Sequence, residues 1–184
     1  MPGLSWRNAI AYLKPRLPDG LDEPVLALTQ EESPVLRDLG NGLLVAYLID
    51  EGDQFSYVQN EDLSATGASE AKLHQCAIHN LYDLADNKGV RVQPYGSIFA
   101  MFLDGNFERS LLLLDTLWDQ SLAEHVPDGA VVAAPTRDVL AFGNRATPGV
   151  MEELRAVVDR VSENCDCPAP FLERRDQAWV QRDT

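Results

Sequence analysis

Alternating apolar and polar side chains predict a chain built largely of β-hairpins. The run Leu43–Ile49 is apolar at consecutive positions, which is typical of a strand covered on both faces, and we expect it to be a central strand. After an acidic turn, Gln54–Val58 alternates polar and aromatic residues, so the two runs predict an antiparallel hairpin. Further strands are predicted at 90–93, 97–103, 130–134 and 139–142, the last two forming a second hairpin.

Apolar residues spaced by three and four positions predict helices. The clearest helix covers about Ser69–Ala85, and a second follows Thr147–Pro148 to about Glu163. A polar turn at Asp104 runs into an apolar segment, which predicts a helix to about Glu124 that is buried on more than one side. A short helix carrying Trp6, Ile10 and Leu13 is predicted before the prolines that follow.

These elements predict an α+β fold, in which a mixed, mainly antiparallel sheet built from hairpins packs against two or three helices. A chain of 184 residues suits one domain, so residues 1–164 are predicted to form a single α+β domain. A Cys-Asp-Cys-Pro-Ala-Pro sequence then interrupts regular structure, and we expect residues 165–184 to be a loosely held C-terminal tail.

The formal net charge of -14 narrows the classes of partner. A field of this sign repels nucleic acid and attracts basic protein surfaces, although solubility alone also explains an acidic composition. The apolar runs are too short to cross a membrane, and the first residues lack the pattern of a secretory signal. Three cysteines fit a reducing compartment, so we expect a cytoplasmic protein that binds neither nucleic acid nor membrane directly.

The first hairpin carries the strongest candidate for a recognition surface. Its acidic residues are not interrupted by Lys or Arg, and two aromatic residues lie between them. A solvated turn explains the same residues, because like charges so close together are tolerated when water surrounds them. The residues predicted to bind a partner are Asp50, Glu51, Asp53, Phe55, Tyr57, Glu61 and Asp62.

A second polar set lies where the apolar segment after Asp104 and the second hairpin begin. Carboxylates and an arginine can perform acid-base chemistry or bind phosphate if the fold brings them together. Helix capping and an ion pair in the turn explain the same residues and are the simpler interpretation. The residues of this alternative site are Asp104, Asn106, Glu108, Arg137 and Asp138.

No metal site or cofactor is predicted. His74 and His79 are five residues apart on a helix, which turns their side chains about 140° from each other. Cys76 falls in an apolar stripe, and Cys165 and Cys167 lack further ligands nearby, so we expect free thiols. The sequence contains no phosphate-binding glycine loop, nucleophile elbow or His-Glu-x-x-His motif.

The sequence resembles the YtpQ-like bacterial proteins, an uncharacterised family grouped as a domain of unknown function. The resemblance spans about residues 20–145, and this chain departs from the family pattern at Asp104, where a glycine is common, and in its proline-rich C-terminal part. The resemblance implies a fold similar to that of the family but no activity, cofactor or catalytic residue. The segments that carry it are Leu43–Asp53, Gly105–Glu108, Ser110–Asp115, Trp118 and Ala134–Leu140.

The leading hypothesis is a non-enzymatic acidic binding protein, such as an immunity or antitoxin protein that blocks the basic active site of a nuclease-like toxin. The negative charge would steer association, and an aromatic residue such as Phe55, Tyr57 or Trp179 would anchor the contact. The alternative is a small hydrolase or phosphate-handling enzyme that uses Asp104, Glu108, Arg137 and Asp138. A third possibility is a structural subunit whose acidity is incidental.

Overall fold

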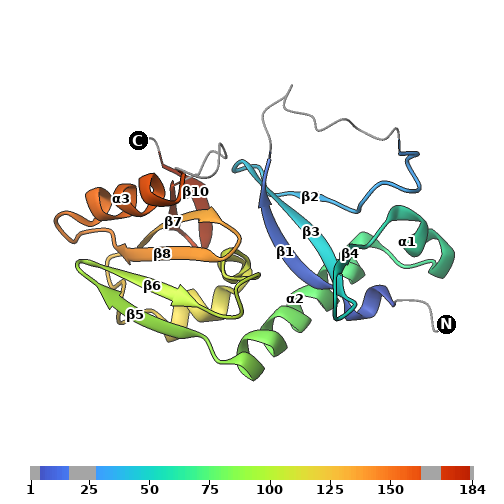
Figure 1. Cartoon of the computed structure of the whole chain (residues 1–184), viewed down its shortest axis with the longest axis horizontal. Helices are drawn as coiled ribbons and strands as arrows, with labels where there is room; N and C mark the ends of the chain where they lie inside the picture. The colour runs from blue at the N-terminus through green and yellow to red at the C-terminus, as the bar shows by residue number, and fades with distance from the viewer. Residues whose placement is uncertain (1–4, 17–27, 163–170, 183–184) are drawn as a thin grey trace.

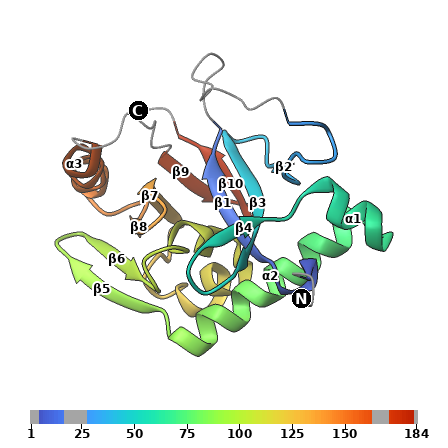
Figure 2. The ribbon, with the colours of Figure 1, turned by 45° about the vertical axis from the view of Figure 1, so that its right-hand side comes forward.

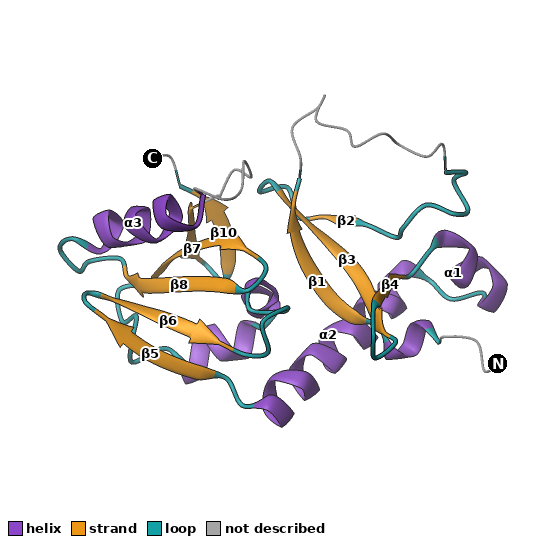
Figure 3. Cartoon of the chain, in the orientation of Figure 1, coloured by secondary structure: helices purple, strands orange, loops and turns teal. Residues whose placement is uncertain are grey.

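The computed structural model describes residues 5–16, 28–162 and 171–182, which form two antiparallel sheets and the helices around them (Figure 1). This confirms the predicted α+β class, with two sheets in place of one (Figure 3). One continuous hydrophobic cluster contains residues of both sheets and of the long helix α2. Among the described residues, no helix is both long enough and apolar enough to cross a membrane.

The four-stranded sheet is organised around β3 (Leu43–Asp50), as the sequence predicted. β1 (Ile10–Pro15) pairs along one edge of β3, whereas β2 (Arg37–Asp38) and β4 (Phe55–Tyr57) pair with opposite ends of its other edge. Five consecutive residues of β3 from Val45 onward are buried, which explains its uninterrupted apolar sequence. The predicted first hairpin is therefore confirmed as β3 and β4.

One face of this sheet is covered by α2 (Glu70–Lys88), which follows the short helix α1 (Asn60–Thr66) (Figure 2). Gly67 adopts a φ of 64° and ends α1, and the Ser69 side chain then accepts the Lys72 amide at the start of α2. The residues that α2 buries recur at steps of four, as its predicted stripe required, and they are Leu73, Ala77, Leu81 and Ala85.

The six-stranded sheet has the order β10-β9-β7-β8-β6-β5. Its strands are β5 (Arg91–Tyr95), β6 (Ile98–Phe102), β7 (Ala130–Thr136), β8 (Val139–Asn144), β9 (Phe171–Arg175) and β10 (Ala178–Gln181). Residues of β7 alternate between its faces: Val131 and Ala133 pack against α3 (Val150–Ser162), whereas Ala130, Val132 and Ala134 pack into the main core. The sheet is thus a middle layer with α3 on its outer face.

The segment after Asp104 is not the continuous helix that its apolar sequence predicted. It forms a 3-10 turn at Arg109–Leu113, breaks at Leu114, and forms a π-helical turn at Leu117–Ser121. The Leu111 carbonyl, which an α-helix would pair with residue 115, instead accepts the Leu114 amide and the Trp118 indole N–H at 2.9 Å. The expected burial on more than one side is confirmed, because most of the leucines and Trp118 lie in the core.

The predicted N-terminal helix is also wrong beyond its first turn. Only Trp6–Asn8 is helical, and the chain then enters β1. Ala11 and Leu13 are buried while their neighbours are partly exposed, so the strand period of two governs this segment.

The prediction of a loosely held tail is wrong for residues 171–181. They form the hairpin of β9 and β10, and β9 pairs with β7 inside the six-stranded sheet. Phe171 and Leu172 are buried there, so the hairpin contributes to the core. Cys165 and Cys167 lie outside the described residues.

Candidate functional site

The open face of the first hairpin carries the most exposed aromatic residues near the predicted binding surface. Phe55 and Tyr57 are 36% and 41% exposed. The strand register places them opposite Asp50 and Leu48, on the side of the sheet that α2 does not cover. We call the surface formed by Tyr12, Leu48, Asp50, Phe55 and Tyr57 the hairpin face.

A cavity of about 120 Å³ opens on the hairpin face, and we call it the hairpin pocket. It combines residues from both predicted sets, because the loop before Arg109 and the turn after β7 reach the same place. The Arg109 amide donates to the Arg137 carbonyl at 3.1 Å, which joins these two segments. The hairpin pocket is lined by Tyr12, Leu48, Phe55, Tyr57, Asn106, Phe107 and Arg137.

Aromatic side chains hold the pocket wall together. The Phe107 ring, which is 1% exposed, meets the Tyr12 and Phe55 rings edge to face at centroid distances of 5.9 and 5.6 Å. Such geometry is the favourable one for aromatic rings. Burial, and then the neighbouring Tyr12, raise the pKa of Tyr57 above its usual value. The pocket therefore has a fixed apolar wall with a polar rim.

The acidic turn at the end of the hairpin is organised by its own carboxylates. The Asp50 carboxylate accepts a hydrogen bond from the Gly52 backbone amide at 2.7 Å. The Glu51 carboxylate accepts hydrogen bonds from the Ser56 hydroxyl and the Gln54 side-chain amide. Hydrogen bonds from Ser56, and then from Gln54, lower the pKa of Glu51 below its usual value. Asp53 is exposed. Local hydrogen bonds and exposure to solvent thus agree with the interpretation of a solvated turn, and all three acidic residues remain exposed.

Glu61 and Asp62 do not extend the acidic turn. They belong to α1, which follows β4, whereas the turn precedes β4, so the two acidic groups lie at opposite ends of that strand (Figure 2). Asp62 accepts the Gln59 amide at 2.8 Å and caps α1. Of the predicted partner-binding residues, the structure brings together those from Asp50 to Tyr57 and separates these two.

Asp104 and Glu108 serve the loop rather than an exposed site. Asp104 accepts the amides of Asn106 and Phe107 at 3.0 and 3.1 Å. Glu108 is 2% exposed and accepts the amides of Leu103 and Gly105, both at 2.8 Å. A general acid or base must reach its substrate, and Glu108 is enclosed.

Arg137 and Asp138 are exposed at the turn between β7 and β8. Of the alternative set, the structure brings only Asn106 and Arg137 to one cavity. The structure therefore brings together the amide and the guanidinium of the alternative site, but not its three carboxylates.

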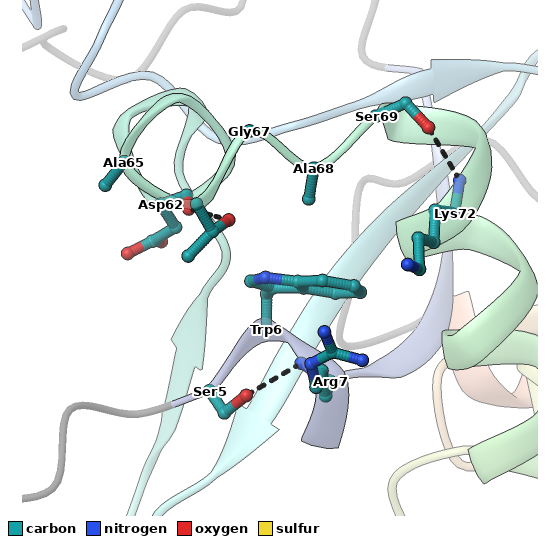
Figure 4. Close-up of a pocket in the computed structure, with 10 residues that line it drawn as sticks. Ser5, Trp6, Arg7, Asp62, Ala65, Gly67, Ala68, Ser69 and Lys72 are labelled. Carbon is teal, nitrogen blue, oxygen red and sulfur yellow. Dashed lines mark hydrogen bonds between the residues drawn. The ribbon is translucent and has the colours of Figure 1, made fainter.

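A larger cavity of about 500 Å³ lies between the N-terminal turn and the α1–α2 junction (Figure 4). Its polar groups are largely used by local structure: Ser5 accepts the Arg7 amide, Ser69 accepts the Lys72 amide, and Asp62 caps α1. The Arg7 guanidinium lies 4.8 Å from the Trp6 ring centroid, and that indole is 5% exposed. The lining is thus explained by helix ends and core packing, and we give this cavity less weight than the hairpin pocket.

A buried tyrosine and a histidine form a pair that the sequence did not reveal. The Tyr47 side chain is fully buried, and its hydroxyl lies 3.1 Å from Nδ1 of His74 on α2. Burial raises the pKa of Tyr47 to about 12 and lowers that of His74. The hydrogen bond between them satisfies a hydroxyl inside the core.

The other described histidines and acids do not assemble around a metal. His79 points elsewhere and pairs with Asp83 at 3.6 Å, one turn along α2. Within the described ranges, no group of three or more His, Cys, Asp or Glu residues is placed to hold a metal ion.

Comparisons with models of protein families, with curated proteins and with solved structures gave no match to this chain. The resemblance to YtpQ-like proteins therefore remains a prediction from the sequence, and any function must be argued from the hairpin face and its surroundings.

Proposed function

We propose that this chain is a non-enzymatic binding protein that engages a basic protein partner through the hairpin face and the acidic turn beside it. The observation that carries the proposal is the exposure of Phe55 and Tyr57 next to Asp50, Glu51 and Asp53 on one edge hairpin. Exposed aromatic residues beside charged ones are typical anchors of protein interfaces.

The outer edge of β4 supports this use. The Glu51 backbone amide donates to the Gln54 carbonyl, and the Val58 backbone amide donates to the Tyr47 carbonyl. These two bonds show which residue pairs of the hairpin are hydrogen-bonded. Because these positions alternate in an antiparallel pair, the backbone groups of Phe55 and Tyr57 point away from β3. Within the described ranges no strand pairs with that edge, so a partner could hydrogen-bond along it.

The charges favour a partner that is basic opposite the turn. Asp50 and Phe55 are cross-strand neighbours, so an incoming Arg or Lys could meet a carboxylate and an aromatic ring together. A net charge of -14 would also accelerate association with a basic protein. The active site of a nuclease-like toxin has this chemistry, and an immunity or antitoxin role is the setting we propose.

The hydrolase alternative receives less support. It needs at least two carboxylates that reach one substrate, yet Glu108 is buried and Asp104 holds two backbone amides of its own loop. No observed feature favours an enzyme over a binding protein at this place.

Affinity capture from the native cell tests the proposal. Tagged protein is compared with a variant whose turn is neutral (Asp50→Asn, Glu51→Gln, Asp53→Asn) and with a control that removes three exposed charges elsewhere (Asp86→Asn, Glu124→Gln, Asp159→Asn). We expect one basic protein to be retained by the wild type and the control, and to be lost from the turn variant or above about 0.5 M salt. Capture of no basic protein, or equal capture by both variants, would refute the proposal.

A further inference from the structure

Among the described residues, the polar groups that line the hairpin pocket can all donate hydrogen bonds and include no carboxylate, although the chain as a whole is strongly acidic. Its polar groups are the phenols of Tyr12 and Tyr57, the Asn106 amide and the Arg137 guanidinium. The chain has 29 acidic residues and 15 Lys and Arg, so its surface as a whole favours cations. The one fixed charge of this cavity is positive, so the cavity favours an anion.

The guanidinium of Arg137 is available. Arg137 is exposed, and no carboxylate of the described ranges lies within ion-pair distance of it. A second cation lies close, since Lys14 Nζ is 5.9 Å from the Tyr57 ring centroid. A planar guanidinium with free N–H groups matches a carboxylate in a two-pronged geometry.

The size of the pocket limits what the carboxylate can be attached to. A cavity of 150 Å³ lined by apolar side chains accommodates benzene, so about 120 Å³ with an open mouth admits one ring or one branched side chain. The walls suit such a body, because the aromatic residues Tyr12, Phe55 and Phe107 line the pocket.

We propose that the hairpin pocket binds a carboxylate carried on a ring-sized apolar body. The carboxylate accepts hydrogen bonds from Arg137 and Asn106, and the body lies between Tyr12, Phe55 and Tyr57. Both a free aromatic acid and the C-terminal aromatic residue of a peptide have this chemistry. The inference goes beyond the proposed function and does not rest on it, since it concerns the isolated protein.

Titration of the isolated protein with matched probes, followed by amide chemical shifts, tests the inference. The probes are benzoate, neutral benzamide and cationic benzylamine, which share a ring and differ in charge. We expect benzoate to bind about tenfold more tightly than benzamide, with shifts at Phe55, Tyr57, Asn106 and Arg137. Benzylamine should not bind at the pocket.

Two variants locate the effect. Arg137→Gln should weaken benzoate binding about tenfold and leave benzamide unchanged, whereas Arg155→Gln, which removes an exposed arginine on α3, should change neither. Equal affinity for benzoate and benzamide, or benzoate binding that is indifferent to Arg137→Gln, would overturn the inference.

N-acetylphenylalanine and its C-terminal amide then separate the two sources. Binding of the acid but not the amide assigns the pocket to a peptide C-terminus, and binding of benzoate alone assigns it to a free acid. Either result supports the inference. Failure of every acid would leave partner capture by the acidic turn unaffected, so the two proposals fail separately.

Discussion

The carboxylate of Glu173 on β9 offers the sharpest test of the C-terminal hairpin. Its side chain is 3% exposed and accepts hydrogen bonds from three arginines: Arg175 at 2.9 Å, Arg145 at 3.0 Å and Arg182 at 3.3 Å. These partners, Arg175 above all, lower the pKa of Glu173 from 4.5 to about 2 against the opposing effect of burial. Replacing Glu173 with Gln keeps the shape and removes the charge.

The magnitude follows from linkage between protonation and folding. Each pH unit by which a folded-state pKa is lowered is worth about 1.4 kcal/mol, so the full effect at Glu173 is about 3 kcal/mol. The three guanidinium groups are 35% to 61% exposed, and solvent screening reduces this value. We expect Glu173→Gln to lower the free energy of unfolding by about 2 kcal/mol at pH 7.

The pH dependence has a definite sign. Because the folded-state pKa is depressed, the stabilisation is complete above pH 4.5 and disappears as pH falls towards about 2. Urea unfolding of wild type and Glu173→Gln between pH 7 and 3.5 measures it, with Glu124→Gln as an exposed control. A difference that stays constant over this range, or no difference at pH 7, would refute the reasoning.

Three further substitutions test local structure, each by urea unfolding. Gly96→Ala should cost about 1–2 kcal/mol, because Gly96 has a φ of 59° and the Glu153 carboxylate lies against it; an unchanged midpoint would contradict this. Tyr47→Phe should cost about 1 kcal/mol by removing the hydroxyl that pairs with His74. The stability of the wild type should fall as pH drops through about 6.5, because the pKa of His74 is lowered in the folded state and the unfolded histidine takes up its proton first. Asp104→Ala should cost about 1 kcal/mol, whereas Asp104→Asn keeps the acceptor and should be neutral.

Local sequence patterns were sufficient for most of the regular elements. The helices α2 and α3 were predicted from apolar residues at helical spacing, whereas β3 and the hairpin of β7 and β8 were predicted from short apolar runs bounded by turns, which suit strands buried on both faces. The same reasoning failed for the segment after Asp104, because its leucines are buried on several sides. The Trp118 indole then takes a backbone carbonyl that a helix would need.

Only the part of the candidate site that lies on one hairpin was predictable from the sequence. Alternation after the acidic turn indicated that Phe55 and Tyr57 share a face, and the structure places both on the hairpin face. Nothing local indicated that Asn106 and Arg137 would line the same pocket, because this depends on how the two sheets pack. The Tyr47–His74 pair was hidden for a similar reason, since Tyr47 lies within an apolar run and its partner is 27 residues away.

The C-terminal hairpin was missed because two of the four buried residues of β9, Glu173 and Arg174, are charged. A sequence such as Phe-Leu-Glu-Arg-Arg reads as a surface segment unless its partners are known, and here those partners lie far along the chain. Arg174, which is 7% exposed at its side chain, is held by Asp119 at 2.8 Å and Asp115 at 2.9 Å. A buried charge is tolerated when it is paired in this way.

Leu172 distinguishes an integral hairpin from a loosely held tail. It is 1% exposed and lies between Val132 of β7 and Gln181 of β10, so Leu172→Ala should lower the free energy of unfolding by about 2–4 kcal/mol. A mobile tail would lose less than about 0.5 kcal/mol from the same change. Leu36→Ala is the matched control, because Leu36 is 44% exposed and should show only that smaller effect. If urea unfolding cannot distinguish the two variants, β9 does not contribute to the core, and the stabilisation assigned to Glu173 fails with it.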